Sequence, residues 1–355
     1  MFTVNRVQAA PVLISKERLR QGTARAILIN SGCANCLTGD AGLRDARTLS
    51  KDVADGLGVL EREVLVASTG IIGRRLPVPK IRRAIPKLLK HLSRTDHVSA
   101  AQGILTTDLR IKETAVQAAI GGKAVRVGGM AKGAGMIAPS MATMLSVITT
   151  DAVISPGLLR RLLQSAVAQS FNHITVDGDM STNDTVFALA SGRSGVTIRR
   201  GTAGARVFTE MLGAVSEKLS QMIVHDGEGV ARVMRVEVVG AHTDREAQAA
   251  ARQVANSPLV KTMLAGGDPN VGRIAAAAGS SSAQFDPDRL EITIGPQRVV
   301  SRGVALRVGK AVARELLTPA HVVVRIHLHA GRATGRMLTC DLTERYIQIN
   351  ARYST

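Results

Sequence analysis

Residues 128–145, with the sequence GGMAKGAGMIAPSMATML, hold the residue types most able to do chemistry. Their four glycines give a backbone that can bend sharply and approach other segments closely. Lys132 is the only charge in this stretch, and an isolated charge is costly to bury unless it meets an anion. Thr143 follows the small residue Ala142 at the start of an apolar run. The pattern predicts a loop that presents a hydroxyl nucleophile or, as the plainer interpretation, a glycine-rich connection between two strands.

Other common catalytic and metal-binding motifs are absent from the sequence. It contains no G-x-x-x-x-G-K-[ST], no H-E-x-x-H and no G-x-S-x-G. Cys33 and Cys36 form a C-x-x-C pair, but a zinc site would need a second pair and only Cys340 remains. His327 and His329 share one face of an expected strand without an evident third ligand. We therefore predict no metal ion, and we interpret the cysteine pair as small residues of a tight loop.

Composition limits the class of protein. The 355 residues are 45% hydrophobic and 21% charged, which is ordinary for a globular protein, and the length fits about two domains. Three cysteines do not require an oxidising compartment. The uncharged stretch 133–150 contains a proline and several glycines, which argues against a membrane span, and residues 1–19 lack the pattern of a signal peptide. We expect a soluble, cytoplasmic protein without membrane partners.

Positive charge is concentrated in the first part of the chain. The net charge is +18, and the eight basic residues between Arg74 and Arg94 are not interrupted by an acid. This run predicts either a solvated helix face or a patch for phosphate groups or an acidic partner. Only 2% of residues are aromatic, which is a poor match for a protein that stacks nucleic-acid bases. Nucleic acid is therefore not an expected partner.

Strand-like and helix-like patterns alternate along the chain, which indicates an α/β protein. The expected strands are Ala26–Asn30, 63–67, 123–127, 144–148, 231–239, 290–294 and 322–328. The expected helices are 41–57, with Asp40 as its cap, 79–92, 155–169, 205–223, 245–255 and 258–264. A change of composition at 240–244 suggests that a smaller C-terminal unit begins there.

Nine short motifs follow one another in order along the chain. They are FTVNRVQAAPV, NSGCANCLTG, STGIIG, TTD, KGAGMIAPSMATML, FNHITVDGDMSTNDT, HDGEG, GDPNVGRI and INARYST. In this order they resemble the ornithine acetyltransferase (glutamate N-acetyltransferase) family of arginine biosynthesis, over nearly the whole chain. Any one motif alone is weak evidence, but their shared order makes a chance match very improbable.

The resemblance implies layered sheets flanked by helices, of the αββα type found in self-cleaving enzymes with an N-terminal nucleophile, and a smaller C-terminal α/β unit. It also implies that the chain cuts itself between Ala142 and Thr143, when the threonine hydroxyl attacks the preceding carbonyl. The two products would stay associated and pair into a heterotetramer. The implied parts are a first chain, a core segment with the nucleophile, and a C-terminal unit whose tail returns to the active site: residues 1–142, 143–240 and 241–355.

The implied reaction moves acetyl from N2-acetylornithine to glutamate through an acetyl-Thr143 intermediate, without a cofactor and with acetyl-CoA as a possible second donor. The freed α-amino group of Thr143, with a reference pKa of ~7.7–8.0, would act as the base for its own hydroxyl. By similarity, the Thr69 hydroxyl and the Gly70 N–H form the oxyanion hole.

The positions that match substrate contacts of the family are Thr106, Lys132, Thr143, Glu228, Asn350 and Thr355. Lys132 would meet a substrate carboxylate and Glu228 the substrate ammonium group. Both substrates carry an α-carboxylate, so cationic and amide donors are expected in the pocket.

Members of this family carry a further segment, with a core strand, before the block that begins at Phe2, so we expect an exposed sheet edge. The sequence also has Cys33, Met180 and Val271 where the family usually has Asn, Thr and Trp. Two alternatives stay open. One is a self-cleaving aminopeptidase of the related fold, and the other is a truncated, inactive homologue with a basic surface that binds nucleic acid.

Overall fold

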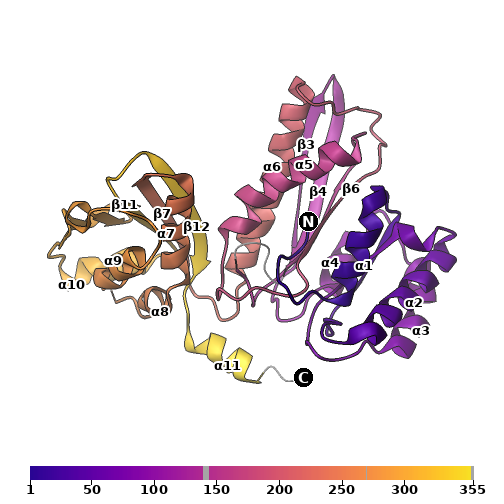
Figure 1. Cartoon of the computed structure of the whole chain (residues 1–355), viewed down its shortest axis with the longest axis horizontal. Helices are drawn as coiled ribbons and strands as arrows, with labels where there is room; N and C mark the ends of the chain where they lie inside the picture. Colours follow the sequence, from indigo (N-terminus) through magenta and orange to yellow (C-terminus); the bar gives the residue numbers. More distant parts are fainter. Residues whose placement is uncertain (139–143, 269, 353–355) are drawn as a thin grey trace. The chain divides into compact units, whose positions relative to one another are not determined.

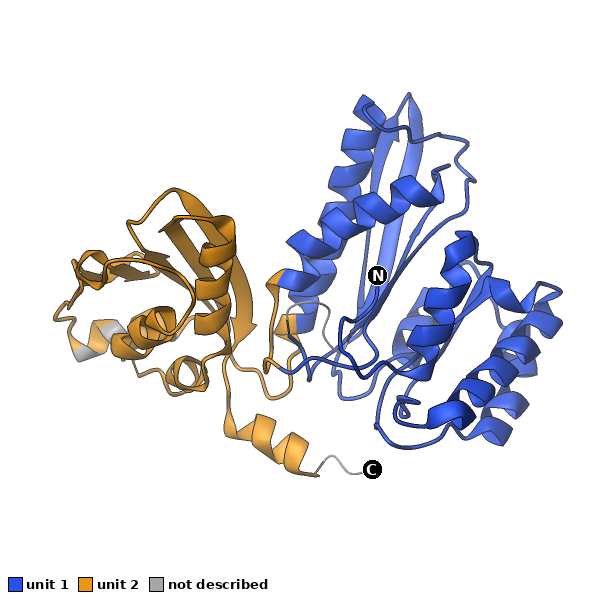
Figure 2. Ribbon diagram, viewed as in Figure 1, with its two compact units in different colours: residues 1–172, 179–223 blue, residues 173–178, 224–355 orange. Residues whose placement is uncertain are grey.

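The chain forms two compact units (Figures 1 and 2). The computed structural model describes residues 1–138, 144–268 and 270–352. Unit 1 comprises Met1–Asn172 and Asp179–Ile223, and unit 2 comprises His173–Gly178 and Val224–Thr355. Among the described residues, no helix is long and apolar enough to cross a membrane.

Unit 1 contains two sheets. The larger has the strand order β3-β4-β5-β6, in which β5 and β6 are parallel and the other neighbours antiparallel. Its strands are β3 (Lys112–Ile120), β4 (Lys123–Lys132), β5 (Leu145–Thr150) and β6 (Thr185–Ala190). The smaller sheet pairs β1 (Ala26–Asn30) and β2 (Val64–Ser68) in parallel. Gly121 and Gly122, with φ of 60° and 77°, form the tight turn between β3 and β4, where backbone in the left-handed region favours glycine.

The helices of unit 1 cover the outer faces of these sheets (Figure 1). They are α1 (Ala10–Arg18), α2 (Gly39–Leu57), α3 (Val78–Lys90), α4 (His97–Gly103), α5 (Pro156–Gln169) and α6 (Ala203–His225). Leu65 of β2 packs with Leu145 and Phe187 of the larger sheet, so the two sheets lie face to face. On the outer side of the smaller sheet, Leu49 of α2 packs in one cluster with Val64.

Helix α6 lies on the outer side of the larger sheet. A Cβ at Gly129 of β4 would lie 3.1 Å from the Leu219 side chain of α6 and 3.1 Å from the Val147 carbonyl oxygen. The layers are therefore helix, sheet, sheet and helix, and the predicted αββα arrangement is confirmed.

Unit 2 is the smaller α/β unit. Its sheet has the order β10-β9-β8-β11-β7-β12, with β7 (Val233–Ala241), β8 (Glu291–Ile294), β9 (Gln297–Ser301), β10 (Val304–Ala305), β11 (His321–His327) and β12 (Ala333–Cys340). Its helices are α7 (Asp244–Asn256), α8 (Pro258–Gly266), α9 (Val271–Gly279), α10 (Lys310–Leu317) and α11 (Glu344–Arg352). A Cβ at Gly335 would lie 2.4 Å from the Ala247 backbone, so only glycine lets α7 approach β12 this closely.

Most expected elements are present, with shifted ends. The helix predicted at 155–169 is present as α5, and the Ser155 hydroxyl caps it by accepting a hydrogen bond from the Leu158 N–H. The predicted cap of α2 is wrong: Asp40 lies in the first turn, and Thr38 holds the cap position without a side-chain cap bond. The change of composition at 240–244 falls at the end of β7, inside unit 2.

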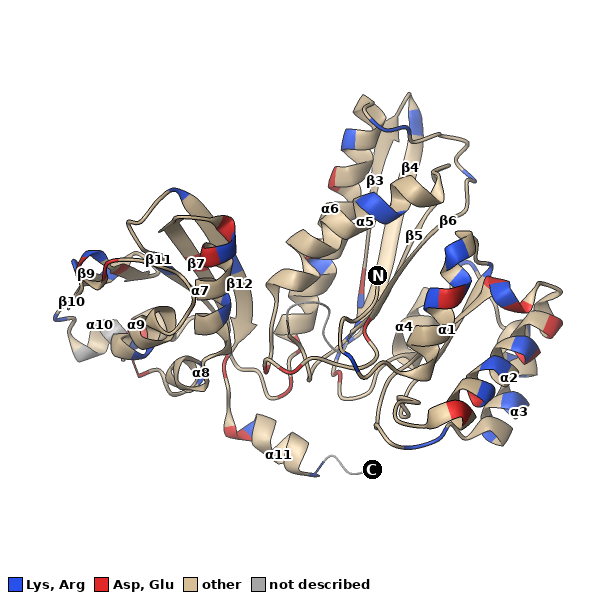
Figure 3. Ribbon diagram, in the orientation of Figure 1, with Lys and Arg blue, Asp and Glu red and all other residues tan. Residues whose placement is uncertain are grey.

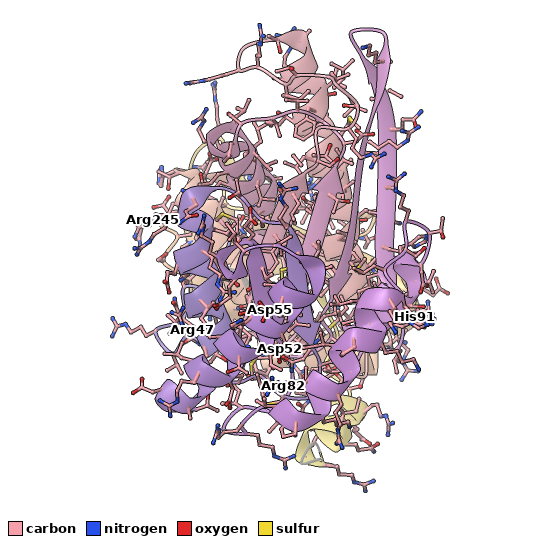
Figure 4. All side chains as sticks on the ribbon, turned by 90° about the vertical axis from the view of Figure 1, so that its right-hand side faces the viewer. Arg47, Asp52, Asp55, Arg82, His91 and Arg245 are labelled. Atoms are coloured by element: carbon pink, nitrogen blue, oxygen red, sulfur yellow. The ribbon has the colours of Figure 1, made fainter. Side chains whose placement is uncertain are left out.

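The basic run at 74–94 lies mostly on α3, beside the acidic side chains of α2 (Figure 3). Arg82 contacts Asp52 with an Nε–Oδ2 distance of 2.7 Å, between the two helices (Figure 4). Arg75 binds Asp45 at 2.8 Å. These contacts support the interpretation of the run as a solvated helix face, because two of its arginines, Arg75 and Arg82, pair with acids of the neighbouring helix.

Candidate active site

The predicted oxyanion hole lies at the end of β2. Thr69 directly follows the strand, is buried, and donates its N–H to the Asn30 carbonyl oxygen at 3.0 Å. Gly70 has a φ of +125°, and a Cβ there would lie 2.3 Å from the Gly32 carbonyl carbon. Only glycine fits both the conformation and the space, so the backbone after Thr69 is held in a shape that other residues would destroy.

Lys132 brings three predicted site residues together. It is the last residue of β4 and is 2% exposed. Its Nζ lies 2.9 Å from Thr106 Oγ1 and 3.3 Å from Thr69 Oγ1. The Thr69 and Thr106 side chains come from separate segments, and both contact the Lys132 ammonium group.

Asp108 lies close to the Lys132 ammonium group and was not predicted as a site residue. Its Oδ1 accepts hydrogen bonds from Lys112 Nζ at 2.7 Å and from the Gly133 N–H at 2.6 Å. Its Oδ2 accepts the Thr106 N–H at 3.2 Å and lies 3.5 Å from Lys132 Nζ. Burial acts to raise the pKa of Asp108, but the charges of Lys132 and Lys112 outweigh it and lower the pKa to about 2. The position of Asp108 in the TTD motif is the sequence signal that could have indicated it.

Asp184 is a second residue that sequence reasoning missed. Its Oδ1 accepts the Met144 N–H at 3.0 Å, and the Met144 carbonyl accepts the Thr185 N–H at 3.1 Å. Asp184 is completely buried, which raises its pKa well above the usual range and favours the neutral acid. Both the N–H and the carbonyl group of Met144 are therefore hydrogen-bonded. The predicted cleavage site, Ala142 and Thr143, lies outside the described residues.

Asn183 links β6 to the oxyanion-hole segment. Its Nδ2 donates to the Ser68 carbonyl at 2.8 Å and to the Ala34 carbonyl at 2.7 Å. The side chain is buried, and its Oδ1 accepts the Thr182 hydroxyl at 2.6 Å. Because the Ser68 carbonyl belongs to the peptide group that precedes Thr69, this amide fixes the end of β2 relative to β6.

The remaining described site residues lie together in unit 2. Asn350 of α11 donates from Nδ2 to Glu228 Oε2 at 2.7 Å and to the Tyr346 carbonyl at 3.1 Å. Gly229 has a φ of +72°, and a Cβ there would lie 2.6 Å from the Tyr346 nitrogen. The turn at Glu228 therefore packs directly against α11. Thr355 lies outside the described residues.

The described arrangement suits the stabilisation of negative charge. In unit 1, a buried ammonium group points at two hydroxyl oxygens, which are groups able to bind a carboxylate or a developing oxyanion.

All three cysteines are buried free thiols, and Cys33 Sγ donates to the Arg74 carbonyl at 3.2 Å. Among the residues that the structure describes, no group of three His, Cys, Asp or Glu side chains could hold a metal ion.

The chain is similar to known proteins over most or all of its length. "Arginine biosynthesis bifunctional protein ArgJ" of Dehalococcoides mccartyi is 43% identical, over 100% of this chain and 87% of the relative. The protein of the same name from Geobacter sulfurreducens is 45% identical, over 100% of this chain and 91% of the relative. The crystal structure of arginine biosynthesis bifunctional protein ArgJ from Bacillus halodurans superposes with a TM-score of 0.57 at 39% identity, covering 59% of this chain and 99% of that one. The sequence model of the ArgJ family matches residues 1–355, and the chain belongs to the ArgJ family.

Proposed function

We propose that the protein is an acetyltransferase of arginine biosynthesis that moves acetyl from N2-acetylornithine to glutamate through an acetyl-Thr143 intermediate. The observation that carries the proposal is the buried Lys132 ammonium, 3.3 Å from Thr69 Oγ1 and 2.9 Å from Thr106 Oγ1. A cation beside two hydroxyls is the kind of group that binds a substrate carboxylate or an oxyanion, and this supports the proposal. The relatives named as arginine biosynthesis proteins support the same reaction class.

The first step is self-cleavage. The Thr143 Oγ attacks the Ala142 carbonyl carbon, the C–N bond breaks, and the nitrogen takes up a proton as an ester forms. Water then hydrolyses the ester and leaves a carboxylate on Ala142 and a free α-amino group on Thr143. The bonds that hold Met144 to Asp184 and Thr185 support this step, because they fix the residue that follows the nucleophile.

Acetyl transfer then proceeds in two matched half-reactions. Thr143 Oγ attacks the acetyl carbonyl of N2-acetylornithine, and its proton passes through the α-amino group to the leaving ornithine nitrogen. The α-amino group of glutamate next attacks the acetyl ester and regenerates the hydroxyl. The Thr69 hydroxyl and the Gly70 N–H stabilise the tetrahedral oxyanion in each half, and such a donor contributes ~10²–10³ in rate.

Substrate recognition uses both ends of an amino acid. In this proposal Lys132 binds the α-carboxylate with help from Thr106, and Glu228 binds the ammonium group. Asn350 holds the Glu228 carboxylate through its 2.7 Å hydrogen bond, and Thr355 is assigned a contact by the resemblance. Because the relatives are named bifunctional, we extend the proposal to acetyl-CoA as a second acetyl donor.

The cleaved chains are proposed to stay associated and to form a heterotetramer in the cytoplasm. Strand β4 lies before the cut and β5 after it, and the two pair antiparallel from Val127↔Thr150 to Lys132↔Leu145. One sheet therefore contains strands of both chains. Native mass spectrometry should give about twice the 37.4 kDa of one chain.

The deciding experiment is the intact mass of the protein beside a Thr143→Ala variant. We expect two pieces of about 15 and 22 kDa from the 37.4 kDa chain, and one uncut chain in the variant. The cleaved protein should then transfer isotope-labelled acetyl from N2-acetylornithine to glutamate. An uncut wild-type chain, or hydrolysis of peptide amides without transfer to glutamate, would overturn the proposal, and the latter would favour the aminopeptidase.

A further inference from the structure

Lys112 is a second buried lysine near the site, and the proposed reaction gives it no role. It is 1% exposed and is among the largest fully buried side chains of the described residues. Its Nζ lies 2.7 Å from Asp108 Oδ1, and the side chain of Asp108 has no exposed surface. A buried ion pair is commonly no more stable than an apolar pair of similar size. Stability alone therefore does not account for this pair.

The two lysines share Asp108 unequally. Lys112 makes the short contact of 2.7 Å, and the nearest Lys132 contact is 3.5 Å. The remaining bonds to Asp108 come from the N–H groups of Gly133 and Thr106. Both lysines stabilise the Asp108 carboxylate, and the shorter of the two contacts is the hydrogen bond from Lys112.

Lys112 makes the shorter contact with Asp108, whereas Lys132 lies closer to two hydroxyl groups than to that carboxylate. Lys132 Nζ lies 2.9 Å from Thr106 Oγ1 and 3.3 Å from Thr69 Oγ1, so its positive charge acts directly on both hydroxyl oxygens. A hydroxyl has one hydrogen to donate and can accept two bonds. When Thr69 Oγ1 accepts from Lys132, its own hydrogen is left for a further acceptor, such as the oxyanion.

We propose that Lys112 and Asp108 are positioning residues: Lys112 occupies the Asp108 carboxylate, and so keeps the Lys132 ammonium directed at Thr69, Thr106 and the substrate carboxylate. The inference rests on the proposed acetyl transfer. Without Lys112, the full charge of Asp108 would draw Lys132 into an internal ion pair and away from the substrate. Without both Lys112 and Asp108, Lys132 would again be available.

The test is a double-mutant cycle of wild type, Asp108→Asn, Lys112→Met and the double variant, with KM for glutamate, kcat, self-cleavage and Tm measured for each. Lys112→Met should raise KM by about 10- to 100-fold, the range for a lost charge-assisted hydrogen bond. The double variant should recover most of this loss although its Tm stays low. Lys261→Met, at a buried lysine of unit 2 whose Nζ lies 3.1 Å from Thr339 Oγ1, is the matched control and should lower Tm without raising KM.

The outcomes separate the two proposals. A wild-type protein that cleaves itself but transfers no acetyl would refute the proposed function, whereas an active wild type with unchanged KM in Lys112→Met would refute only the positioning role. A double variant as impaired as Lys112→Met would also refute it, because a merely structural pair gives no recovery. If Lys112→Met does not fold, Lys112→Gln takes its place in the cycle. The same two results are then required: an increased KM in the single variant and recovery of KM in the double variant.

Discussion

Replacement of Asn183 by alanine should damage stability and catalysis together. The side chain donates to the Ser68 and Ala34 carbonyls at 2.8 and 2.7 Å and accepts from Thr182 at 2.6 Å. At a net ~0.5–1.5 kcal/mol for each hydrogen bond, the loss of three lowers the free energy of unfolding by ~1.5–4.5 kcal/mol. The upper part of this range applies, because the two carbonyls would be left buried without that donor.

The substitution should also affect the proposed oxyanion hole. Ser68 precedes Thr69, so a released Ser68 carbonyl lets the end of β2 shift, and a misplacement of about 1 Å costs on the order of 10²-fold in rate. Urea unfolding gives the stability change, and the rate of acetyl transfer at saturating substrate gives the catalytic change. Asn5→Ala is the control, because the Asn5 side chain is partly exposed: its Nδ2 donates to the half-buried Met180 carbonyl at 3.0 Å, and its Oδ1 accepts the exposed Val7 N–H at 2.9 Å. A stability loss below ~0.5 kcal/mol with unchanged kcat would refute the reasoning.

Three further predictions concern the same region. Asp184→Asn should retain self-cleavage because an amide oxygen can still accept the Met144 N–H, whereas Asp184→Leu should slow it at least tenfold in a gel-based time course. Gly70→Ala should destabilise the fold by ~3 kcal/mol or more, since its Cβ would lie 2.3 Å from the Gly32 backbone; a melting temperature equal to wild type would contradict this. Burial acts to raise the pKa of Asp108, but the Lys132 and Lys112 charges lower it to about 2, so the stability that its carboxylate contributes is present above pH ~4 and is lost as pH falls toward 2. The stability difference between wild type and Asp108→Asn, from urea unfolding at several pH values, should shrink over that window.

Much of the fold can be predicted from sequence patterns, and the missed elements have physical reasons. Strand β1 has the predicted bounds, because its apolar run is followed by a sharp turn. Strand β4 runs on through Gly128 and Gly129, where glycines indicated a loop. At Gly129 a side chain would meet Leu219 of α6, and no local pattern shows that a distant helix packs there. Strand β3 was missed because it begins at Lys112, a charge that looks solvent-exposed until Asp108 is placed beside it.

Some residues of the candidate site could also be predicted from the sequence, and others were missed. Thr69, Thr106 and Lys132 could be predicted because the motifs around them resemble those of a known family, and the structure brings them together. Asp108 was missed although it lies in the TTD motif, because carboxylates in loops are usually solvated and its bond to the Gly133 N–H joins distant residues. Asp184 could not be predicted, since the Met144 N–H that it accepts lies 40 residues away in the sequence. The isolated charge of Lys132 was a sound clue on physical grounds alone, because a buried ammonium needs oxygen partners.

If the proposed cut occurs, the pairing of β4 with β5 also determines the order in which folding and cleavage take place. In the intact chain the two strands belong to one polymer, so their meeting is a unimolecular loop closure that costs little entropy. After a cut between Ala142 and Thr143, the same pairing becomes an encounter of separate molecules, which depends on concentration. Folding must then precede cutting, and a denatured cleaved sample should refold with second-order kinetics where the uncut Thr143→Ala chain refolds with first-order kinetics. The intact chain would therefore fold quickly, whereas the two pieces would refold slowly after denaturation because they must first associate.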